Sequence, residues 1–227
     1  MSEAIVKVDN LSFGYEKKLL LNNISFRIYR KDYIAIVGAN GSAKSTLLKL
    51  IMGFLKPNGG RIKIYDSSIE SFKDWNKIGY LPQNARNFNT RFPATVEEIV
   101  GSSQYSQMSI LKKLNKKISK NTLSALEAVD MLGFKDRLIG NLSGGQQQRV
   151  FLARLLVNNP EIIFMDEPLI GVDSESQDVF FDLIDKLNNY YGITIVIVTH
   201  DISTLQHKVN RIFHLDSGKV NIDDLKN

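Results

Sequence analysis

The sequence predicts an α/β protein in which helices cover both faces of a parallel sheet. Two runs, EIIFMDEP (161–168) and GITIVIVTH (192–200), are almost continuously apolar, which is typical of strands buried on both faces. A third apolar run, YIAIV (33–37), leads straight into the glycine-rich stretch GANGSAKST (38–46). Segments with helical spacing alternate with these strands, and this alternation is typical of a parallel α/β fold.

Composition limits the classes of protein that fit. The chain has 227 residues, of which 43% are hydrophobic, so it can bury a sizeable core. It has no cysteine, which excludes disulfides and thiolate metal sites. The net charge of +5 is too mild to indicate nucleic-acid binding. Neither a signal peptide nor a run of roughly 18 apolar residues is visible, so we expect a chain that does not cross a membrane by itself.

The remaining elements follow from hydrophobic spacing. The N-terminal part has the short strand patterns IVKV (5–8) and ISFRIY (24–29). After the glycine-rich stretch, TLLKLIMGF (46–54) has the spacing of a buried helix, which we expect to stop at Pro57, Asn58 and the two glycines that follow. Strand, glycine-rich turn and helix therefore follow one another directly.

The middle of the chain changes character. From about Pro82 to Asn141 strand patterns are few, and helical patterns appear at 95–101 and 121–134. We interpret this as a mostly helical subdomain, followed by helices at 146–157 and 175–190. A lysine-rich run, LKKLNKKISK (111–120), is either the solvated face of an amphipathic helix or a contact with anionic lipid headgroups.

The stretch 38–46, here called the phosphate loop, fits G-x-x-x-x-G-K-[ST] with one departure. Gly38 and Gly41 give the turn its freedom. Lys44 would reach the β- and γ-phosphates of a nucleotide, and the Ser45 hydroxyl would bind Mg²⁺. Alanine occupies position 43, where the pattern has glycine. A positive φ there would strain an alanine and damage the site, whereas a helical φ would suit it. Because the other nucleotide-site residues are present, we expect alanine to be tolerated.

Two carboxylates follow the apolar strand at 161–165. Asp166 and Glu167 lie where α/β proteins bind ligands, although a plain polar strand end is the alternative. In the functional interpretation Asp166 holds Mg²⁺ through water, and Glu167 polarises the water that attacks the γ-phosphate.

A second glycine-rich helix start lies in NLSGGQQQRV (141–150). Ser143 can cap the helix, and the bare backbone of Gly144 and Gly145 can approach an anion closely. The chain then has two phosphate-binding helix ends, although one nucleotide needs only one.

LSGGQ followed by QQR, upstream of a strand that ends in DEP, resembles the signature of ATP-binding-cassette (ABC) ATPases. Four further positions match in family order: Tyr15, the aromatic residue that stacks on adenine; Gln83 of the Q-loop; Gly171-Val172-Asp173 of the D-loop; and His200, the switch histidine. The resemblance covers essentially the whole chain. It implies one nucleotide-binding domain over 1–227, made of a P-loop ABC ATPase core with a parallel sheet, an N-terminal antiparallel β subdomain and an inserted helical subdomain at roughly 84–158.

The resemblance also implies the site. ATP and Mg²⁺ would be its cofactors, with Glu167, His200 and Gln83 catalytic and with Ser45, Gln83 and Asp166 around the metal. The residues that contact nucleotide would be Tyr15, Gly38, Asn40, Gly41, Ser42, Ala43, Lys44, Ser45, Thr46, Ser143, Gly144, Gly145 and Gln146. No role is assigned to His207 or His214, and Ser174–Gln177 fits a capping box that starts a helix.

In this family two such domains dimerise head to tail, so that the LSGGQ of one closes over the ATP of the other. The partners implied are transmembrane permease subunits and, for an importer, an extracytoplasmic substrate-binding protein, with the chain peripheral on the cytoplasmic face of the membrane. The segment NARNFNTRFPATVEEIV (84–100) and the compact C-terminus look like those of zinc and manganese uptake ATPases. The alternatives are the ATPase of an exporter, an importer with another cargo, and a catalytically silent regulatory ABC protein.

Overall fold

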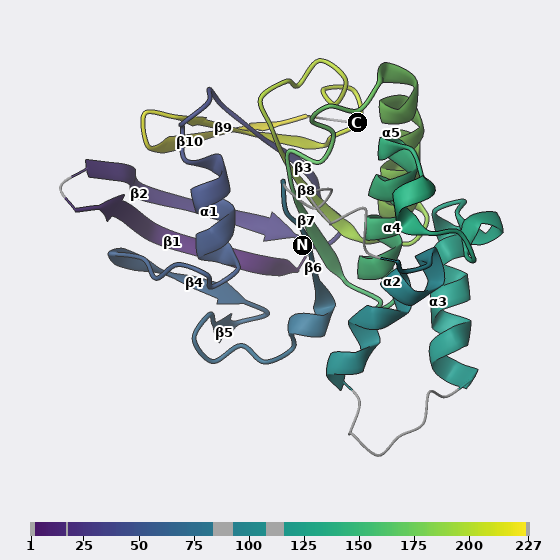
Figure 1. Ribbon diagram of the computed structural model, residues 1–227. Coiled ribbons are helices and arrows are strands. Elements are labelled where there is room, and N and C mark those ends of the chain that lie inside the picture. Colours follow the sequence, from purple (N-terminus) through teal and green to yellow (C-terminus); the bar gives the residue numbers. More distant parts are fainter. Residues whose placement is uncertain (1–2, 17, 84–92, 108–115, 226–227) are drawn as a thin grey trace. The chain divides into compact units, whose positions relative to one another are not determined.

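The computed structural model describes residues 3–16, 18–83, 93–107 and 116–225. The chain forms two compact units (Figure 1). The first unit consists of Met1–Trp75, Ile162–Glu167 and Asp185–Asn227, and the second consists of Asn76–Glu161 and Pro168–Ile184.

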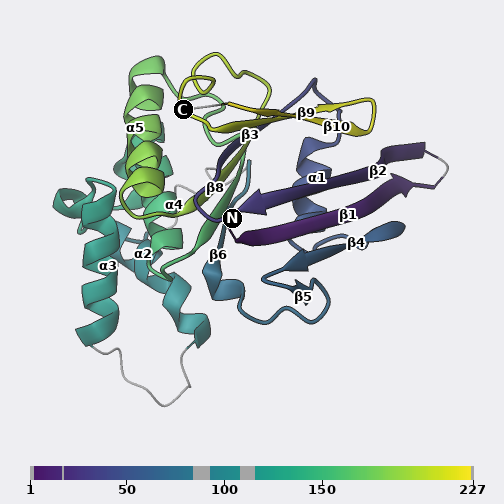
Figure 2. The same cartoon turned by 180° about the vertical axis from the view of Figure 1, so that it is seen from behind.

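An antiparallel sheet forms the N-terminal part of the first unit. Its strands, in spatial order, are β2 (Lys18–Tyr29), β1 (Ala4–Tyr15), β4 (Gly59–Ile64) and β5 (Ser67–Ser68). Val8 of β1 pairs with Phe26 of β2 on one side and with Ile62 of β4 on the other, and all three side chains are buried. Figure 2 shows this sheet from behind, with helix α1 on its far side.

A mainly parallel sheet forms the rest of the first unit. In spatial order its strands are β10 (Lys219–Asp224), β9 (Arg211–Asp216), β3 (Tyr33–Val37), β8 (Thr194–Thr199) and β7 (Ile162–Asp166). Only β10 runs antiparallel to its neighbour. Every residue of β3 and β7 is buried, as predicted from their continuous apolar runs.

The register of the parallel strands fixes where the site lies. Val37 at the end of β3 pairs with Thr199 of β8, and Asp166 at the end of β7 pairs with Val198. The phosphate loop, Asp166 and His200 therefore leave the sheet at one edge, because parallel strands present their carboxyl ends together. Helix α1 (Lys44–Ile51) follows the phosphate loop, buries Leu47, Leu48 and Leu50, and contacts β7.

The second unit is mostly helical. It contains the strand β6 (Ile78–Leu81) and the helices α2 (Val96–Gly101), α3 (Lys116–Ala128) and α4 (Gly144–Leu156). Helix α5 (Ser174–Asn189) belongs to this unit as far as Ile184. The 3-10 turns are Ser102–Gln107, Leu132–Phe134 and Ile139–Asn141, and a further turn, Trp75–Lys77, begins on the last residue of the first unit's N-terminal segment. Helices α2, α3 and α4 contact one another, and Val100, Leu126 and Val150 are completely buried.

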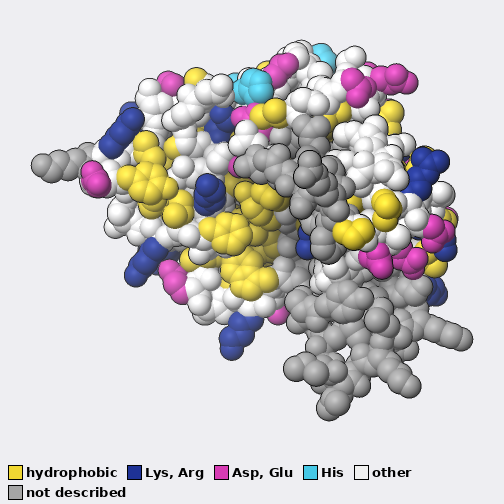
Figure 3. Space-filling view, in the orientation of Figure 1, with side chains coloured by type: hydrophobic (Ala, Val, Ile, Leu, Met, Phe, Trp, Pro, Cys, Tyr) yellow, Lys and Arg dark blue, Asp and Glu magenta, His cyan; other side chains and the backbone are white. Residues whose placement is uncertain are grey.

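Several predicted bounds were wrong by a few residues. Helix α3 ends at Ala128, and a separate 3-10 turn, rather than a continued helix, reaches Phe134. Of the lysine-rich run at 111–120, residues 111–115 lie outside the described residues, and 116–120 form the start of helix α3. Within the described residues no helix combines the length and the apolar character that a membrane crossing needs. Figure 3 shows hydrophobic side chains gathered on one exposed face of the first unit. Phe54 and Trp75 are among the large hydrophobic residues of this unit that are exposed.

Candidate nucleotide-binding site

The phosphate loop is shaped by two glycines. Gly41 has φ 82°, a conformation that suits glycine. A Cβ at Gly38 would lie 2.3 Å from the carbonyl oxygen of Leu215 in β9, so only glycine fits beside that strand. Asn40 is exposed at the top of the loop, while the Ser42 hydroxyl is buried and has no hydrogen-bond partner among the described residues.

Lys44 closes over the loop from the first turn of α1. Its side chain is buried, and its ammonium donates hydrogen bonds to the carbonyl oxygens of Gly38 and Ala39 at 2.8 and 3.0 Å. These oxygens are weak partners for a buried cation compared with a phosphate oxygen. The lysine is therefore held where it can exchange the carbonyls for an anion.

Ala43 is the N-cap of α1 and has φ 73° and ψ 22°, in the left-handed region. The alternative of a helical φ at this position is wrong. The loop demands the conformation for which the motif uses glycine, and an alanine there is strained by on the order of 1 kcal/mol. Tolerance of Ala43 therefore means that the rest of the loop holds the residue in this conformation.

A hydroxyl and a carboxylate meet beside the loop. Ser45 Oγ donates to Asp166 Oδ1 at 2.9 Å, which joins the start of α1 to the end of β7. Burial, together with the nearby charge of Glu167, raises the pKa of Asp166, and the hydrogen bond from Ser45 opposes this rise. A buried carboxylate next to a hydroxyl offers the hard oxygen ligands that Mg²⁺ prefers, and a cation would compensate the buried charge. These residues fit a magnesium ion.

A second polar pair lies at the same edge. His200 Nδ1 lies 2.7 Å from Glu167 Oε2. Glu167 has φ 47°, and its backbone N–H donates to the carbonyl of Val198 at 2.9 Å. A non-glycine residue with positive φ at the end of a buried strand is typical of functional positions. The Glu167 side chain is mostly buried, whereas that of His200 is half exposed.

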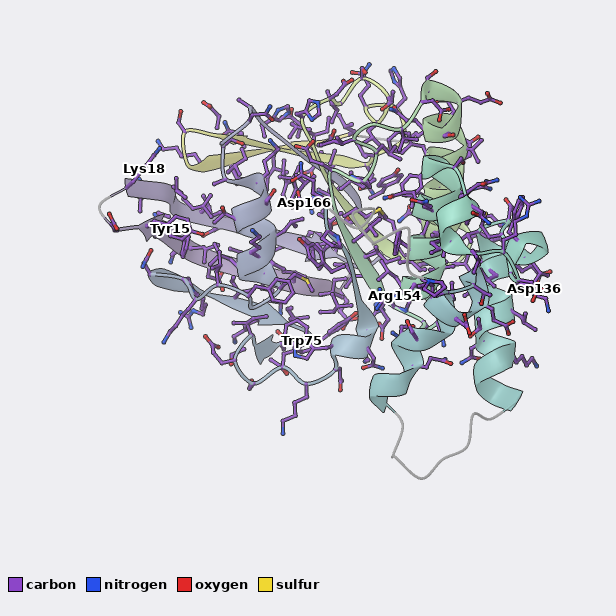
Figure 4. The ribbon with its side chains drawn as sticks, in the orientation of Figure 1. Tyr15, Lys18, Trp75, Asp136, Arg154 and Asp166 are labelled. Atoms are coloured by element: carbon purple, nitrogen blue, oxygen red, sulfur yellow. The ribbon has the colours of Figure 1, made fainter. Side chains whose placement is uncertain are left out.

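Tyr15 lies at the end of β1 in the β1–β2 hairpin (Figure 4). Its ring is 54% exposed, and its only aromatic contact among the described residues is the edge of Phe13, at 5.0 Å between centroids. The open face of this ring can stack on a planar base.

The signature residues lie in the second unit. Ser143 is the N-cap of α4, as expected. It also forms a capping box with Gln146: Ser143 Oγ accepts from the Gln146 N–H at 3.3 Å, and Gln146 Oε1 accepts from the Ser143 N–H at 3.0 Å. Gly144 is exposed. A Cβ at Gly145 would lie 2.7 Å from the Cβ of Ser176 at the start of α5, so this glycine allows two helix starts to approach closely.

Ser143, Gly145, Gln146 and Ser176 line a pocket of about 300 Å³. Arg149 and Glu175 also line it, and sequence reasoning missed both. Arg149 follows Gly145 by four positions, so helical spacing was the available signal. The capping box predicted at Ser174–Gln177 is wrong by one residue, because the carboxylate of Asp173 accepts from the Ser176 N–H at 2.9 Å.

The structure brings Lys44, Ser45 and Asp166 together, and it joins Glu167 to His200. Thr46 lies in the first turn of α1. Gln83 is exposed just after β6 in the second unit, and most of the segment that resembles metal-uptake ATPases, 84–92, lies outside the described residues. His214 pairs with Asp223 at 2.9 Å, and in the sheet it lies beside Val37, the last residue before the phosphate loop.

A strand that runs into a glycine-rich loop and a helix, with a serine–aspartate pair beside it, defines a P-loop nucleotide-binding protein. Comparison with known proteins gives the family. The family model described as ABC transporter matches residues 21–170. A zinc uptake system ATP-binding protein of Listeria monocytogenes is 42% identical over 93% of this chain and 82% of the relative. A manganese transport system ATP-binding protein from the same species is 38% identical over 92% and 83%.

Solved structures agree. The structure of cbiO1 from Clostridium perfringens, part of an ABC transporter complex, superposes with a TM-score of 0.87 at 30% identity, over 98% of this chain and 89% of that one. A bacterial ABC transporter cassette solved as a dimer gives a TM-score of 0.80 at 30% identity, over 98% and 99%. The chain belongs to the ABC transporter family, as an ATP-binding subunit that couples ATP hydrolysis to transport. The predicted family and fold class are thereby confirmed.

Proposed function

We propose that the whole chain, 1–227, is one nucleotide-binding domain that powers the uptake of a divalent metal ion, zinc or manganese. The observation that carries the metal assignment is sequence similarity: relatives at 42, 38 and 35% identity are named for zinc or manganese transport. Gln83 would lie just before the helical subdomain, at roughly 84–158, and together they would pass motion to the membrane partner.

Nucleotide binding would use the groups already poised at the edge of the sheet. The Lys44 ammonium exchanges the carbonyls of Gly38 and Ala39 for β- and γ-phosphate oxygens, and the N–H groups from Gly41 to Thr46 surround the phosphates. Tyr15 stacks on the adenine through its open face. One bound Mg²⁺ would neutralise charge on the phosphates. Ser45 and Gln83 would bind it directly, and Asp166 through water.

Hydrolysis would depend on Glu167. Its carboxylate accepts the proton of the water that attacks the γ-phosphate, and its position is fixed by the backbone hydrogen bond to Val198. His200, 2.7 Å from that carboxylate, orients it and contacts the γ-phosphate. The pair therefore couples the presence of the γ-phosphate to the placement of the base.

The second helix end suggests the assembly. The phosphate loop holds a nucleotide through one helix start, so the start of α4, with Ser143, Gly144, Gly145 and Gln146, remains for a nucleotide held by a second copy. A related cassette is dimeric in its solved structure. We infer a homodimer with ATP at the interface, bound to transmembrane permease subunits on the cytoplasmic face of the membrane. An extracytoplasmic binding protein would deliver the ion.

Reconstitution tests the cargo. The chain is copurified with its membrane permease subunits and placed in proteoliposomes, and ATP-driven movement of zinc and manganese is measured, with calcium and magnesium as comparison ions. We expect ATP-dependent import of zinc or manganese that is lost in Glu167→Gln. Movement of the ion outward, or of neither ion while ATP is hydrolysed, would overturn the metal-import proposal and leave the ATPase assignment standing.

A further inference from the structure

A second pocket lies at the opposite edge of the parallel sheet. It encloses about 420 Å³ and belongs wholly to the first unit. Its walls come from three places: the turn before β3, the last turn of α5 and the turn before β9. Tyr33 in this wall is the first residue of β3 and Val37 is the last, so the length of the strand, about 13 Å, separates the pocket from the phosphate loop.

Two buried polar atoms in this wall have no hydrogen-bond partner among the described residues. The Tyr33 side chain is 2% exposed, and its hydroxyl is unpaired. Asp185 uses Oδ2 to bind Lys208 at 2.6 Å, and its Oδ1 is buried and unpaired. Unpaired buried polar atoms are rare in folded proteins because each loses its hydration without gaining a hydrogen bond in return. Two in one pocket point to a hydrogen-bonding occupant.

The rim adds a free positive charge. The Lys31 ammonium has no hydrogen-bond or ion-pair partner among the described residues, and Lys208 and His207 lie in the same lining. One carboxylate, Asp185, is already engaged by Lys208. The lining thus offers the Lys31 ammonium as a donor for an anion. It also offers two unpaired oxygens: Asp185 Oδ1, which can accept a hydrogen bond, and the Tyr33 hydroxyl.

The wall is held in place before any ligand arrives. The Asn188 amide donates to the carbonyl oxygens of Lys31 and Ile193 at 3.1 and 2.9 Å, which ties α5 to the starts of β3 and β8. Asn210 Oδ1 accepts from the Tyr33 N–H at 3.0 Å. A pocket whose backbone is fixed in this way meets a ligand with little loss of conformational entropy.

We propose that this pocket binds a small organic anion that carries hydroxyl groups. The anionic group would pair with Lys31, and the hydroxyls would donate to Asp185 Oδ1 and bond with the Tyr33 hydroxyl. The volume lies in the range of small-molecule sites and accommodates a six-carbon compound. Nothing in ATP hydrolysis uses these residues, so the site is independent of the metal-uptake proposal.

Three matched probes test the chemistry by calorimetry on the full chain. Gluconate carries both the anion and the hydroxyls, hexanoate carries only the anion, and sorbitol carries only the hydroxyls. We expect gluconate to bind at least tenfold more tightly than either of the other two. Absence of gluconate binding, or equal binding of hexanoate, overturns the proposal.

Variants locate the binding. Tyr33→Phe removes an unpaired buried hydroxyl, so we expect the empty protein to fold and melt no lower than wild type, while gluconate affinity falls about fivefold. Lys31→Met should lower the affinity for gluconate by a similar factor. The control Tyr65→Phe, outside the pocket, should leave affinity unchanged. Lys44→Ala should also leave it unchanged, and loss of gluconate binding in Lys44→Ala but not in Tyr33→Phe would place the anion at the phosphate loop and overturn the proposal.

Discussion

Ala43 holds a backbone conformation that alanine adopts at a cost. Its φ of 73° lies in the left-handed region, where a Cβ crowds the neighbouring carbonyl. We expect Ala43→Gly to stabilise the protein by about 1 kcal/mol, which for a chain of this length raises Tm by about 2 to 4 °C. ATP affinity should change only modestly, because the loop N–H groups keep their direction.

Thermal melting and calorimetry check the Ala43→Gly variant together. The control is Ala35→Gly in β3, where glycine has no positive φ to relieve and deletes a buried methyl group, so Tm should fall. A large gain in turnover in Ala43→Gly would show that the native loop is impaired. An unchanged Tm would contradict the inference that Ala43 is strained in the native loop.

Lys44 is the residue on which nucleotide affinity depends most. Its ammonium is buried, and within the described part of the chain its partners are two carbonyl oxygens, so replacing it with alanine removes the charge that phosphates would meet. Two charge-assisted hydrogen bonds correspond to about a hundredfold or more in affinity. Calorimetric titration of ATP into Lys44→Ala tests this, with exposed Lys56→Ala as the control. Undiminished affinity would refute the phosphate-binding role.

At the scale of elements, the contact between the starts of α4 and α5 is unusually close. Alanine in place of a helical glycine ordinarily stabilises a helix by up to about 1 kcal/mol. A Cβ at Gly145, however, would lie 2.7 Å from the Cβ of Ser176, so we expect Gly145→Ala to destabilise the protein by about 1 to 3 kcal/mol instead.

A double mutant isolates this contact. Ser176→Gly removes the atoms that clash, so the Gly145→Ala/Ser176→Gly variant should be more stable than the sum of the two single changes predicts. Denaturant unfolding of the four proteins gives the coupling energy. Strict additivity would mean that the two helix starts move apart freely.

Sequence reasoning succeeded for elements whose burial is uniform. Strands β3, β7 and β8 were predicted because an unbroken apolar run of four or five residues fits a strand covered on both faces. Strands β9 and β10 were missed because His214, Asp223 and other polar residues interrupt them, so neither has a continuous apolar run. Most of β1 was missed because register shifts interrupt its alternation between Val8 and Gly14.

Some residues of the site could likewise be predicted from the sequence, and others could not. Ser45 was predicted from the phosphate-loop motif. Asp166, Glu167 and His200 were predicted because polar residues at the ends of buried strands meet at one sheet edge. The φ of Ala43 was left open between a helical and a left-handed value, because an alanine side chain is compatible with helical and, at a cost, left-handed backbone. The pocket around Tyr33 and Asp185 joins segments that are about 150 residues apart in the chain, and no local pattern marks it.

At the scale of the whole molecule, we propose that Glu167 is the catalytic base of a site that a second copy of the chain completes. Glutamine keeps the shape of the side chain and its contact to His200 but cannot accept the proton, so Glu167→Gln should bind ATP while turnover falls about 10² to 10⁴-fold. Unhydrolysed ATP would then hold two copies together.

The most direct measurement is the mass of Glu167→Gln by light scattering with Mg-ATP, read together with its hydrolysis rate and with Glu70→Gln as a control that should behave as wild type. We expect a stable species with twice the 25.7 kDa mass of one chain, and almost no release of phosphate. Hydrolysis as fast as in the wild-type protein, or a monomer saturated with ATP, would contradict it.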